Sequence, residues 1–317
     1  MSEAREGGSC RSGNRAPEAR RPGLDVPGAL RRPSAPPYDR GNTLGPRPPP
    51  PEPALPPPPP SSRPPLDALR GRLDAIEARI TAARRRSPFA ADDVTVVIVT
   101  KAAPKDALTF VSKLARKHIG ENRVVDASAK RESAPLGLVW HGIGHLQTNK
   151  AKKAISTFDV FHALDSLRLA EALEPLLAAA GRRWPVYAQV NAANDARKGG
   201  VDAEDALGFL RHLARFPHLD VVGLMTIAKE EDRGEAARPA FRALREIRDD
   251  AFRAGLASER LGLSMGMSDD FEVAVEEGAS IVRLGRALWD AVTPAQATPG
   301  IGLDAGRPSR TVTPEAR

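Results

Sequence analysis

The chain has 317 residues, a formal net charge of +7 and a sequence pI near 9.8. Residues 1–65 supply +4 of that charge, since they hold ten arginines and six acidic residues, so the remaining chain is only mildly basic. Mild basicity does not indicate nucleic-acid binding, and no run of about 18 apolar residues predicts a membrane span.

Residues 1–65 are predicted to form a disordered, proline-rich extension. They hold 19 of the chain's 30 prolines and include the stretch RPPPPEPALPPPPPSSRPP. Such a composition buries too little apolar surface to offset the entropy lost on ordering, and it favours polyproline II geometry. The only cysteine, Cys10, lies here, which excludes an intrachain disulfide and fits a reducing cytoplasm. Residues 291–317 are likewise predicted to be a disordered tail.

Residues 66–290 are predicted to form one globular domain. They begin with LDALRGRLDAIEARITAARRR, where leucines and isoleucines recur at steps of three or four, as on the buried face of a helix. Short apolar runs then alternate with helical patterns. The apolar runs are 94–100, 117–121, 138–144, 160–165, 185–191, 220–227, 260–266 and 280–285. Eight such alternations predict a (β/α)8 TIM barrel, with a doubly wound sheet as the alternative.

The ends of these runs carry polar groups. In a TIM barrel the C-terminal ends of the strands meet at one mouth, where the chemistry lies. Several functional side chains converging there predict a binding site. The residues at or near the ends are Lys101, Glu121, Asn122, His141, Asp165, Asn191, Met225, Thr226, Ser264 and Arg283.

The stretch SMGMSDDFEVAVEEGASIVRLGRA (264–287) suits a phosphate site. Ser264 ends the seventh predicted strand, Ser268 is predicted to cap the helix that follows, and Gly285 lies at the tip of the eighth strand. The loops after strands 7 and 8 commonly hold phosphate in this fold through backbone N–H groups. A plain helix cap and a plain strand turn are the alternative interpretation.

Lys101 and Arg283 are candidates for cofactor chemistry at the same mouth. Lys101 follows the apolar strand VTVVIVT, and alternation directs Arg283 toward the mouth, where it needs an acceptor such as an acidic side chain or a ligand ring nitrogen. A lysine partly desolvated beside a cation suits Schiff-base chemistry. Lysine, phosphate cradle and ring-nitrogen partner together make up a pyridoxal 5′-phosphate (PLP) site. A solvated strand end is the other interpretation of Lys101.

The core resembles the pyridoxal phosphate homeostasis family, which consists of single-domain relatives of the alanine-racemase barrel. The resemblance covers about residues 66–288 and implies a TIM barrel of the alanine-racemase N-terminal type. It rests on motifs that occur in the family's order. They are VTK (99–101), GEN (120–122), WHGIGHLQTNK (140–150), KGG (198–200), GLMTI (223–227), SMGMSDD (264–270) and VRLG (282–285).

The resemblance implies a set of cofactor-binding residues. They are Lys101, Asn122, Met225, Ser264, Ser268, Arg283, Gly285 and Arg286. Lys101 would hold the PLP aldehyde as a Schiff base, and Arg283 would face the pyridine nitrogen. The phosphate would be contacted by Ser264, Ser268, Gly285 and Arg286. The pocket would be lined by Asn122 and Met225. An arginine partner keeps the ring nitrogen unprotonated and weakens the electron sink, which implies a carrier rather than an efficient catalyst.

Several details depart from the family or invite other interpretations. Arg286 stands where many relatives have threonine, so a hydroxyl contact to phosphate would be lost unless the arginine charge replaces it. His141 and His145 have an H-x3-H spacing, but they flank glycines in a strand-to-loop stretch, so metal binding is not favoured. The charged run at 233–253 is interpreted as a solvated helix face.

Two enzyme alternatives share the predicted fold. An amino-acid racemase or decarboxylase would use PLP, but racemases of this fold need a tyrosine from a second domain, and this chain offers only Tyr38 and Tyr187. An aldolase-type barrel would form a Schiff base with a sugar phosphate and would show no cofactor colour. We therefore expect a cytoplasmic, largely non-catalytic PLP carrier, monomeric or weakly dimeric, whose candidate partners are PLP-dependent apoenzymes.

Overall fold

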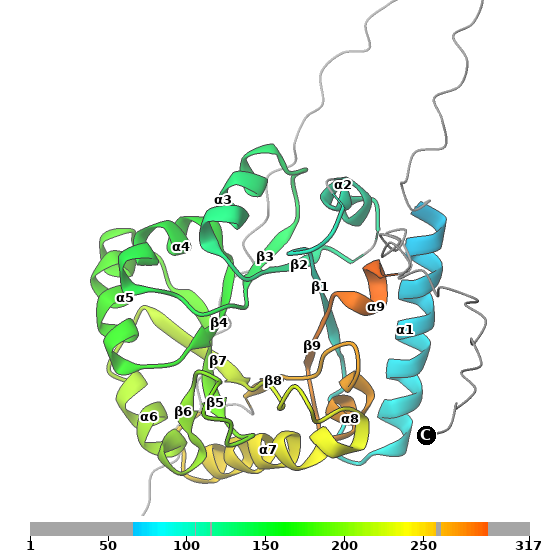
Figure 1. Cartoon of the computed structure of the whole chain (residues 1–317). Coiled ribbons are helices and arrows are strands. Elements are labelled where there is room, and N and C mark those ends of the chain that lie inside the picture. Colours follow the sequence, from blue (N-terminus) through cyan, green and yellow to red (C-terminus); the bar gives the residue numbers. More distant parts are fainter. Residues whose placement is uncertain (1–65, 105, 115, 258–260, 291–317) are drawn as a thin grey trace, which may run out of the picture. The chain divides into compact units, whose positions relative to one another are not determined.

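The computed structural model describes residues 66–104, 106–114, 116–257 and 261–290, which form a barrel of parallel strands ringed by helices (Figure 1). The barrel strands are β1 (Thr95–Val99), β2 (His118–Glu121), β3 (Val139–Gly142), β4 (Val160–Leu164), β5 (Trp184–Asn191), β7 (Leu219–Met225), β8 (Gly262–Ser264) and β9 (Ile281–Leu284). Short strand β6 (Val201–Asp202) pairs with the end of β5. The expectations for residues 1–65 and 291–317, including Cys10 and Tyr38, lie outside the described residues.

Strand pairing closes the barrel. The strands follow the order β4-β3-β2-β1-β9-β8-β7-β5, and β4 also pairs with β5, so each barrel strand has two neighbours. The first and last strands pair in register, with Ile98 opposite Leu284. An open doubly wound sheet would leave two free edges. The predicted (β/α)8 barrel is therefore confirmed, and all its strands point their C-terminal ends toward one mouth.

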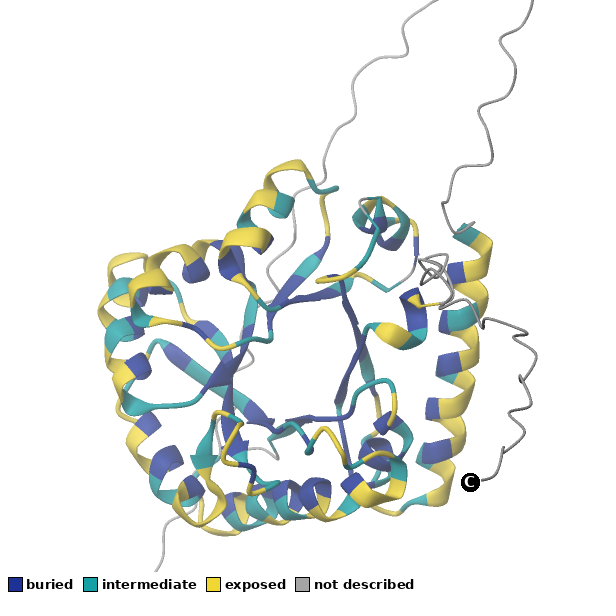
Figure 2. Ribbon diagram, viewed as in Figure 1, coloured by how far each residue is buried: buried dark blue, intermediate teal, exposed yellow. Residues whose placement is uncertain are grey.

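The helices cover the outside of the barrel. They are α1 (Leu66–Arg86), α2 (Ala107–Ser112), α3 (Val124–Ser133), α4 (Ala151–Thr157), α5 (Leu167–Ala179), α6 (Ala206–Leu213), α7 (Arg238–Arg253), α8 (Phe271–Glu276) and α9 (Arg286–Trp289), with short 3-10 turns η1 (Thr148–Lys150), η2 (Ala203–Asp205) and η3 (Gly234–Ala237). Figure 2 shows each long helix buried on its inner face and exposed outside. The predicted stripe of α1 at Leu69, Leu73, Ile76 and Ile80 is buried. Within the described residues, no helix has the length and apolarity that crossing a membrane requires.

The charged run at 233–253 is not a fully solvated face, which corrects the expectation from sequence. Arg245 and Arg248 of α7 are 8% and 6% exposed. Arg245 Nε donates to Glu277 Oε2 at 3.1 Å, and Arg238 Nη1 donates to Glu277 Oε1 at 3.0 Å. Glu277 is itself buried, so these arginines cross from α7 to the end of α8. The pattern of α7 alone could not reveal this partner, because it lies in the next helix.

Candidate functional site

Barrel closure brings the end of β1, which leads to Lys101, beside the end of β9. Trp289 Nε1 of α9 donates to the carbonyl oxygen of Val99 at 2.8 Å, and a Cβ added to Gly285 would lie 3.4 Å from Val99 Cβ. Lys101 follows Val99 by two residues. The lysine and the Gly285 turn therefore belong to adjacent strand ends. The Lys101 side chain is exposed in this structure, as in the solvated-end interpretation and not in the partly desolvated one.

Ser268 links the loop after β8 to α9. Its Oγ accepts a hydrogen bond from the backbone N–H of Ala287 at 3.1 Å. The sequence predicted instead that Ser268 caps the following helix, but α8 begins at Phe271 and has Asp270 at its N-cap position. This hydrogen bond ties the loop after β8 to the helix that directly follows the Gly285 turn, so the two segments that were predicted to hold phosphate are adjacent.

Arg286 directs its side chain away from its own helix. Its Nη2 donates to Asp269 Oδ2 at 2.7 Å, and the side chain is 58% exposed. The guanidinium is thus neutralised by a carboxylate of the loop after β8. This leaves the backbone N–H of Arg286 as its simplest contribution to a ligand at the Gly285 turn.

Arg283 clamps the ends of three neighbouring strands from inside the barrel. Its Nη1 donates to Ser264 O at 2.7 Å and to Ser264 Oγ at 2.8 Å, and its Nη2 donates to Thr226 O at 2.9 Å. Burial lowers the pKa of Arg283 to about 10, and the charge of Asp270 opposes part of that shift. The guanidinium therefore stays charged at neutral pH. These bonds use three of its five N–H groups. Among the described residues the Nε–H donates none of them, so this donor can serve a ligand.

A chain of histidines leads away from Ser264 through the barrel interior. Ser264 Oγ lies 2.8 Å from His162 Nδ1, His162 Nε2 lies 2.8 Å from His141 Nδ1, and His141 Nε2 lies 2.9 Å from His118 Nδ1. The His162 ring also stacks on Tyr187, with ring centroids 4.5 Å apart. These rings fill the barrel below the mouth.

The interior keeps these histidines neutral. Burial lowers the pKa of His141 to about 3, and His118 adds to that shift. The pKa of His162 is lowered well below its usual value by burial first and then by electrostatic interaction with His141 and Arg283. The pKa of His118 is also lowered, by burial and by Arg116. At neutral pH each ring therefore carries a hydrogen on only one of its two nitrogens.

Sequence reasoning missed His118 and His162. A signal was present, since KHIG, WHGI and FHAL each place one histidine within three consecutive strands. Read strand by strand with alternating faces, that recurrence would have indicated an interior row of imidazoles. His141 was named as a strand-end residue, but its partners lie on the two neighbouring strands.

The other predicted pocket residues lie close by. Met225 ends β7, is fully buried, and pairs in register with Ser264 of β8. Asn122 follows β2 and is half-buried; a Cβ added to Gly144 would come 2.4 Å from its carbonyl oxygen, so the loop after β3 rests on its backbone. Within the described part of the chain, no hydrogen bond joins the Asn122 side chain to the rest of the predicted set.

The two histidines of the H-x3-H spacing have separate partners. His141 belongs to the interior chain, whereas His145 Nδ1 lies 2.8 Å from Asp165 Oδ2 at the rim. In the described ranges no group of three or more histidine, cysteine, aspartate or glutamate residues has a metal-binding arrangement. Nothing in these contacts brings the two rings to one ion.

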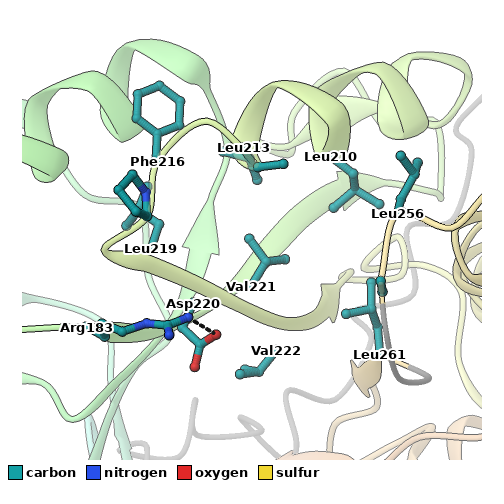
Figure 3. A pocket seen from close by; sticks show the side chains of 13 residues that line it. Arg183, Leu210, Leu213, Phe216, Leu219, Asp220, Val221, Val222, Leu256 and Leu261 are labelled. Carbon is teal, nitrogen blue, oxygen red and sulfur yellow. Dashed lines mark hydrogen bonds and ion pairs between the residues drawn. The ribbon is translucent and has the colours of Figure 1, made fainter.

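A separate pocket lies at the other end of β7, far along that strand from Met225 (Figure 3). Its volume is about 520 Å³, and an ion pair between Arg183 and Asp220 lies on its wall. Its lining includes Leu210, Leu213, Phe216 and Val221. Because it opens near the N-terminal end of β7, it is distinct from the mouth of the barrel.

Comparison with known proteins identifies the family. The model of the alanine racemase N-terminal domain matches residues 72–291. The pyridoxal phosphate homeostasis protein of Aquifex aeolicus is 38% identical over 192 residues, which cover 60% of this chain and 83% of that protein. This chain belongs to the pyridoxal phosphate homeostasis family. The family's protein from Pseudomonas aeruginosa is 36% identical over 199 residues, covering 62% of this chain and 84% of that protein.

A solved structure of a relative agrees with this family assignment. PipY of Synechococcus elongatus PCC7942, solved with PLP bound, is 32% identical and superimposes with a TM-score of 0.61. The similarity covers 70% of this chain and 99% of PipY. The resemblance that the motifs predicted is thereby confirmed at the level of family and fold.

The residues at this mouth suit PLP in their chemistry. Arg283 is a buried cation with an unused donor, which matches an unprotonated ring nitrogen. Gly285 has no side chain and occupies the N-cap position of α9, where backbone N–H groups suit a phosphate. Lys101 is the amine on the adjacent strand end, as the aldehyde of the cofactor requires.

Proposed function

We propose that this chain binds PLP at the mouth of its barrel and serves intracellular PLP homeostasis as a carrier. The observation that carries the proposal is that the end of β1, two residues before Lys101, lies beside the Gly285 turn, while Arg283 of the same strand β9 bonds to the end of β8. The names of the relatives and the PLP bound to PipY support it.

Each residue would contribute one element of binding. Lys101 would attach the cofactor aldehyde as a Schiff base, and Arg283 would donate from Nε to the pyridine nitrogen. The phosphate would be held by Ser268 and by the backbone N–H groups of Gly285 and Arg286. Asn122 and Met225 would line the pocket. Ser264 was predicted to contact the phosphate, but its hydroxyl is fully buried between Arg283 and His162, so we assign it to the support of Arg283.

The identity of the ring-nitrogen partner favours a carrier over an enzyme. Bound PLP supplies an electron sink, which is strongest when the ring nitrogen is protonated. Arg283 has a pKa of about 10 and is an obligate donor at neutral pH, so it cannot accept or share a proton from the ring as a carboxylate would. We therefore propose a protein that retains PLP and turns over amino acids slowly or not at all.

The proposal extends to the setting of the protein. We infer a cytoplasmic location, a monomer or weak dimer, and PLP-dependent apoenzymes as the recipients of the cofactor. Transfer to an apoenzyme requires that the attachment be reversible, and the exposed Lys101 side chain is open to a competing amine.

A visible absorption spectrum of the full chain tests the proposal. After incubation with PLP and gel filtration, we expect a yellow protein whose Schiff-base band is lost in Lys101→Ala. The matched control is Lys113→Ala, which removes an exposed lysine at the end of α2 and should keep the band. A chain that stays colourless and takes up no PLP would contradict the proposal.

Activity assays decide between carrier and enzyme. The PLP-loaded chain should racemise and decarboxylate amino acids at rates close to those of free PLP. Turnover on the order of 1 s⁻¹ or faster, the ordinary range for enzymes, would replace the carrier by the racemase or decarboxylase alternative.

A further inference from the structure

Three histidines connect the mouth of the barrel to its opposite end. His118 opens β2 and is half-buried, whereas Ser264 closes β8 and is fully buried. His141 and His162 lie between them on β3 and β4 and are at most 2% exposed. Since the strands are parallel, the row of contacts runs from the N-terminal end of the barrel to Arg283 at the mouth.

The Ser264 hydroxyl sets the direction of the hydrogen bonds. Arg283 Nη1 donates to Ser264 Oγ, so this oxygen already acts as an acceptor. Its own hydrogen is buried and needs an acceptor. Among the described residues, His162 Nδ1 is the acceptor in reach. Ser264 therefore donates to His162, and the Nδ1 atom of His162 carries no hydrogen.

The direction then passes from ring to ring. A neutral imidazole has one N–H group and one bare nitrogen. Because His162 Nδ1 accepts, its Nε2–H donates to His141 Nδ1, and His141 Nε2–H donates to His118 Nδ1. The last hydrogen, on His118 Nε2, belongs to a half-buried ring that water can reach. Every buried hydrogen-bond donor in the row from Ser264 to His118 then has an acceptor.

Other arrangements leave a contact unsatisfied. If His162 donated to Ser264, the Ser264 hydroxyl hydrogen would have no acceptor within the described part of the chain. A protonated ring carries a hydrogen on both nitrogens, so in this row one of its N–H groups would face a donor of the neighbouring group. Positive charge also faces both ends of the row, from Arg283 beside His162 and from Arg116 beside His118.

We propose that His118, His141 and His162 form a relay of neutral Nε2–H imidazoles that orients the Ser264 hydroxyl as an acceptor for Arg283. They are positioning residues, since none of them needs to touch the cofactor. The link to PLP rests on the proposed function, whereas the hydrogen-bond direction is a property of the chain without ligand. The relay ties the placement of the ring-nitrogen partner to a residue at the far end of the barrel.

Nuclear magnetic resonance of the ligand-free protein tests the direction. The full chain is labelled with ¹⁵N-histidine, and the ring correlations are assigned by single histidine substitutions. At pH 7 we expect the neutral Nε2–H pattern for all three rings, and at pH 5 we expect His141 and His162 to keep it. An Nδ1–H or imidazolium pattern at any of the three rings at pH 7 would overturn the relay.

A pair of variants at His162 tests the positioning role. His162→Leu removes the acceptor for Ser264 and should weaken PLP binding roughly tenfold, the equivalent of one hydrogen bond. His162→Gln supplies one acceptor and one donor, as the Nε2–H ring does, and should bind within about threefold of the parent. The control is His212→Leu, an exposed ring on α6. Equal affinity in parent and His162→Leu, or an equal loss in both His162 variants, would overturn the positioning role.

Thermal unfolding of each variant accompanies the binding measurement. If His162→Leu does not fold, the same comparison is made with His118→Leu and His118→Gln, because that ring is only half-buried. The resonance experiment needs no PLP, so an unexpected ring pattern there contradicts the relay and not the proposed function. Absence of the Schiff-base band contradicts the proposed function and not the hydrogen-bond direction of the relay.

Discussion

Arg283 is a buried cation whose observed hydrogen bonds go to two backbone carbonyls and one hydroxyl. Such a charge is costly to bury, because neutral acceptors replace only part of its hydration. The lowered pKa of about 10 reflects that cost. The same residue spans the ends of β7, β8 and β9, so the group proposed to face the cofactor ring also holds the mouth of the barrel in shape.

Replacing this guanidinium with an ammonium should destabilise the strand ends at the mouth of the barrel. Arg283→Lys keeps the charge but cannot reach three acceptors in a fixed fork, so we expect the free energy of unfolding to fall by about 2–4 kcal/mol. Arg286→Lys is the matched control. Its exposed ion pair with Asp269 should be worth about 0–1 kcal/mol. Urea denaturation measures both, and similar losses in the two variants would contradict the clamp.

At the scale of elements, α9 fastens the last strand to the first. Only Gly285 separates it from β9, and buried Trp289 donates to the carbonyl of Val99 at the end of β1. One indole N–H thereby fixes the spacing between the Gly285 turn and the segment that carries Lys101. The helix is short, but its hydrogen bond adds to the β1–β9 pairing that places Lys101 and the Gly285 turn on one side of the mouth.

Removing this indole should affect stability and binding together. Trp289→Phe loses the hydrogen bond to Val99 and part of the buried area, which should cost about 2–3 kcal/mol and weaken PLP binding. Trp184→Phe is the matched control, since Trp184 Nε1 donates to Phe158 O at 3.1 Å on the opposite side of the barrel. It should lose similar stability but bind PLP normally. Equal PLP affinity in parent and Trp289→Phe would refute the fastening role.

For the molecule as a whole, the interior histidines make stability depend on pH. The pKa of His141 is about 3 and that of His162 is lowered well below its usual value, so the unfolded chain binds protons that the folded barrel does not. The free energy of unfolding should therefore be highest above pH 6.5, and it should fall as the pH drops below that value. Each such ring contributes a slope of about 1.4 kcal/mol per pH unit.

Denaturation at pH 7, 6 and 5 measures this slope. His141→Phe removes one of the two deeply buried rings and should flatten the dependence by roughly 1 kcal/mol per pH unit. His212→Phe changes an exposed ring and should leave the slope as in the parent. Parallel curves for all three proteins would contradict the assignment of the pH dependence to the barrel interior.

The sequence reveals this architecture where the determinant is local. Apolar runs and helical periodicity located every barrel strand and the bounds of α1, and the strand-end rule selected Ser264 and Arg283, which the structure joins by a hydrogen bond. Contacts between distant segments escaped it. Ser268 meets α9 rather than α8, and Glu277 gathers arginines from α7. Such partners depend on how neighbouring loops and helices pack in three dimensions, which the pattern within a single element does not show.

Barrel closure also determines the stage of folding at which the proposed cofactor site can form. Lys101 follows the first strand of the barrel, whereas Gly285 and Trp289 follow the last, so the two halves of the proposed cofactor site are synthesised at opposite ends of the domain. A nascent chain exposes Lys101 long before the turn that would receive the phosphate has been translated. Contacts of such sequence separation form late, after loop closure has been achieved. PLP can therefore stabilise the finished barrel, but it cannot guide the first steps of its folding.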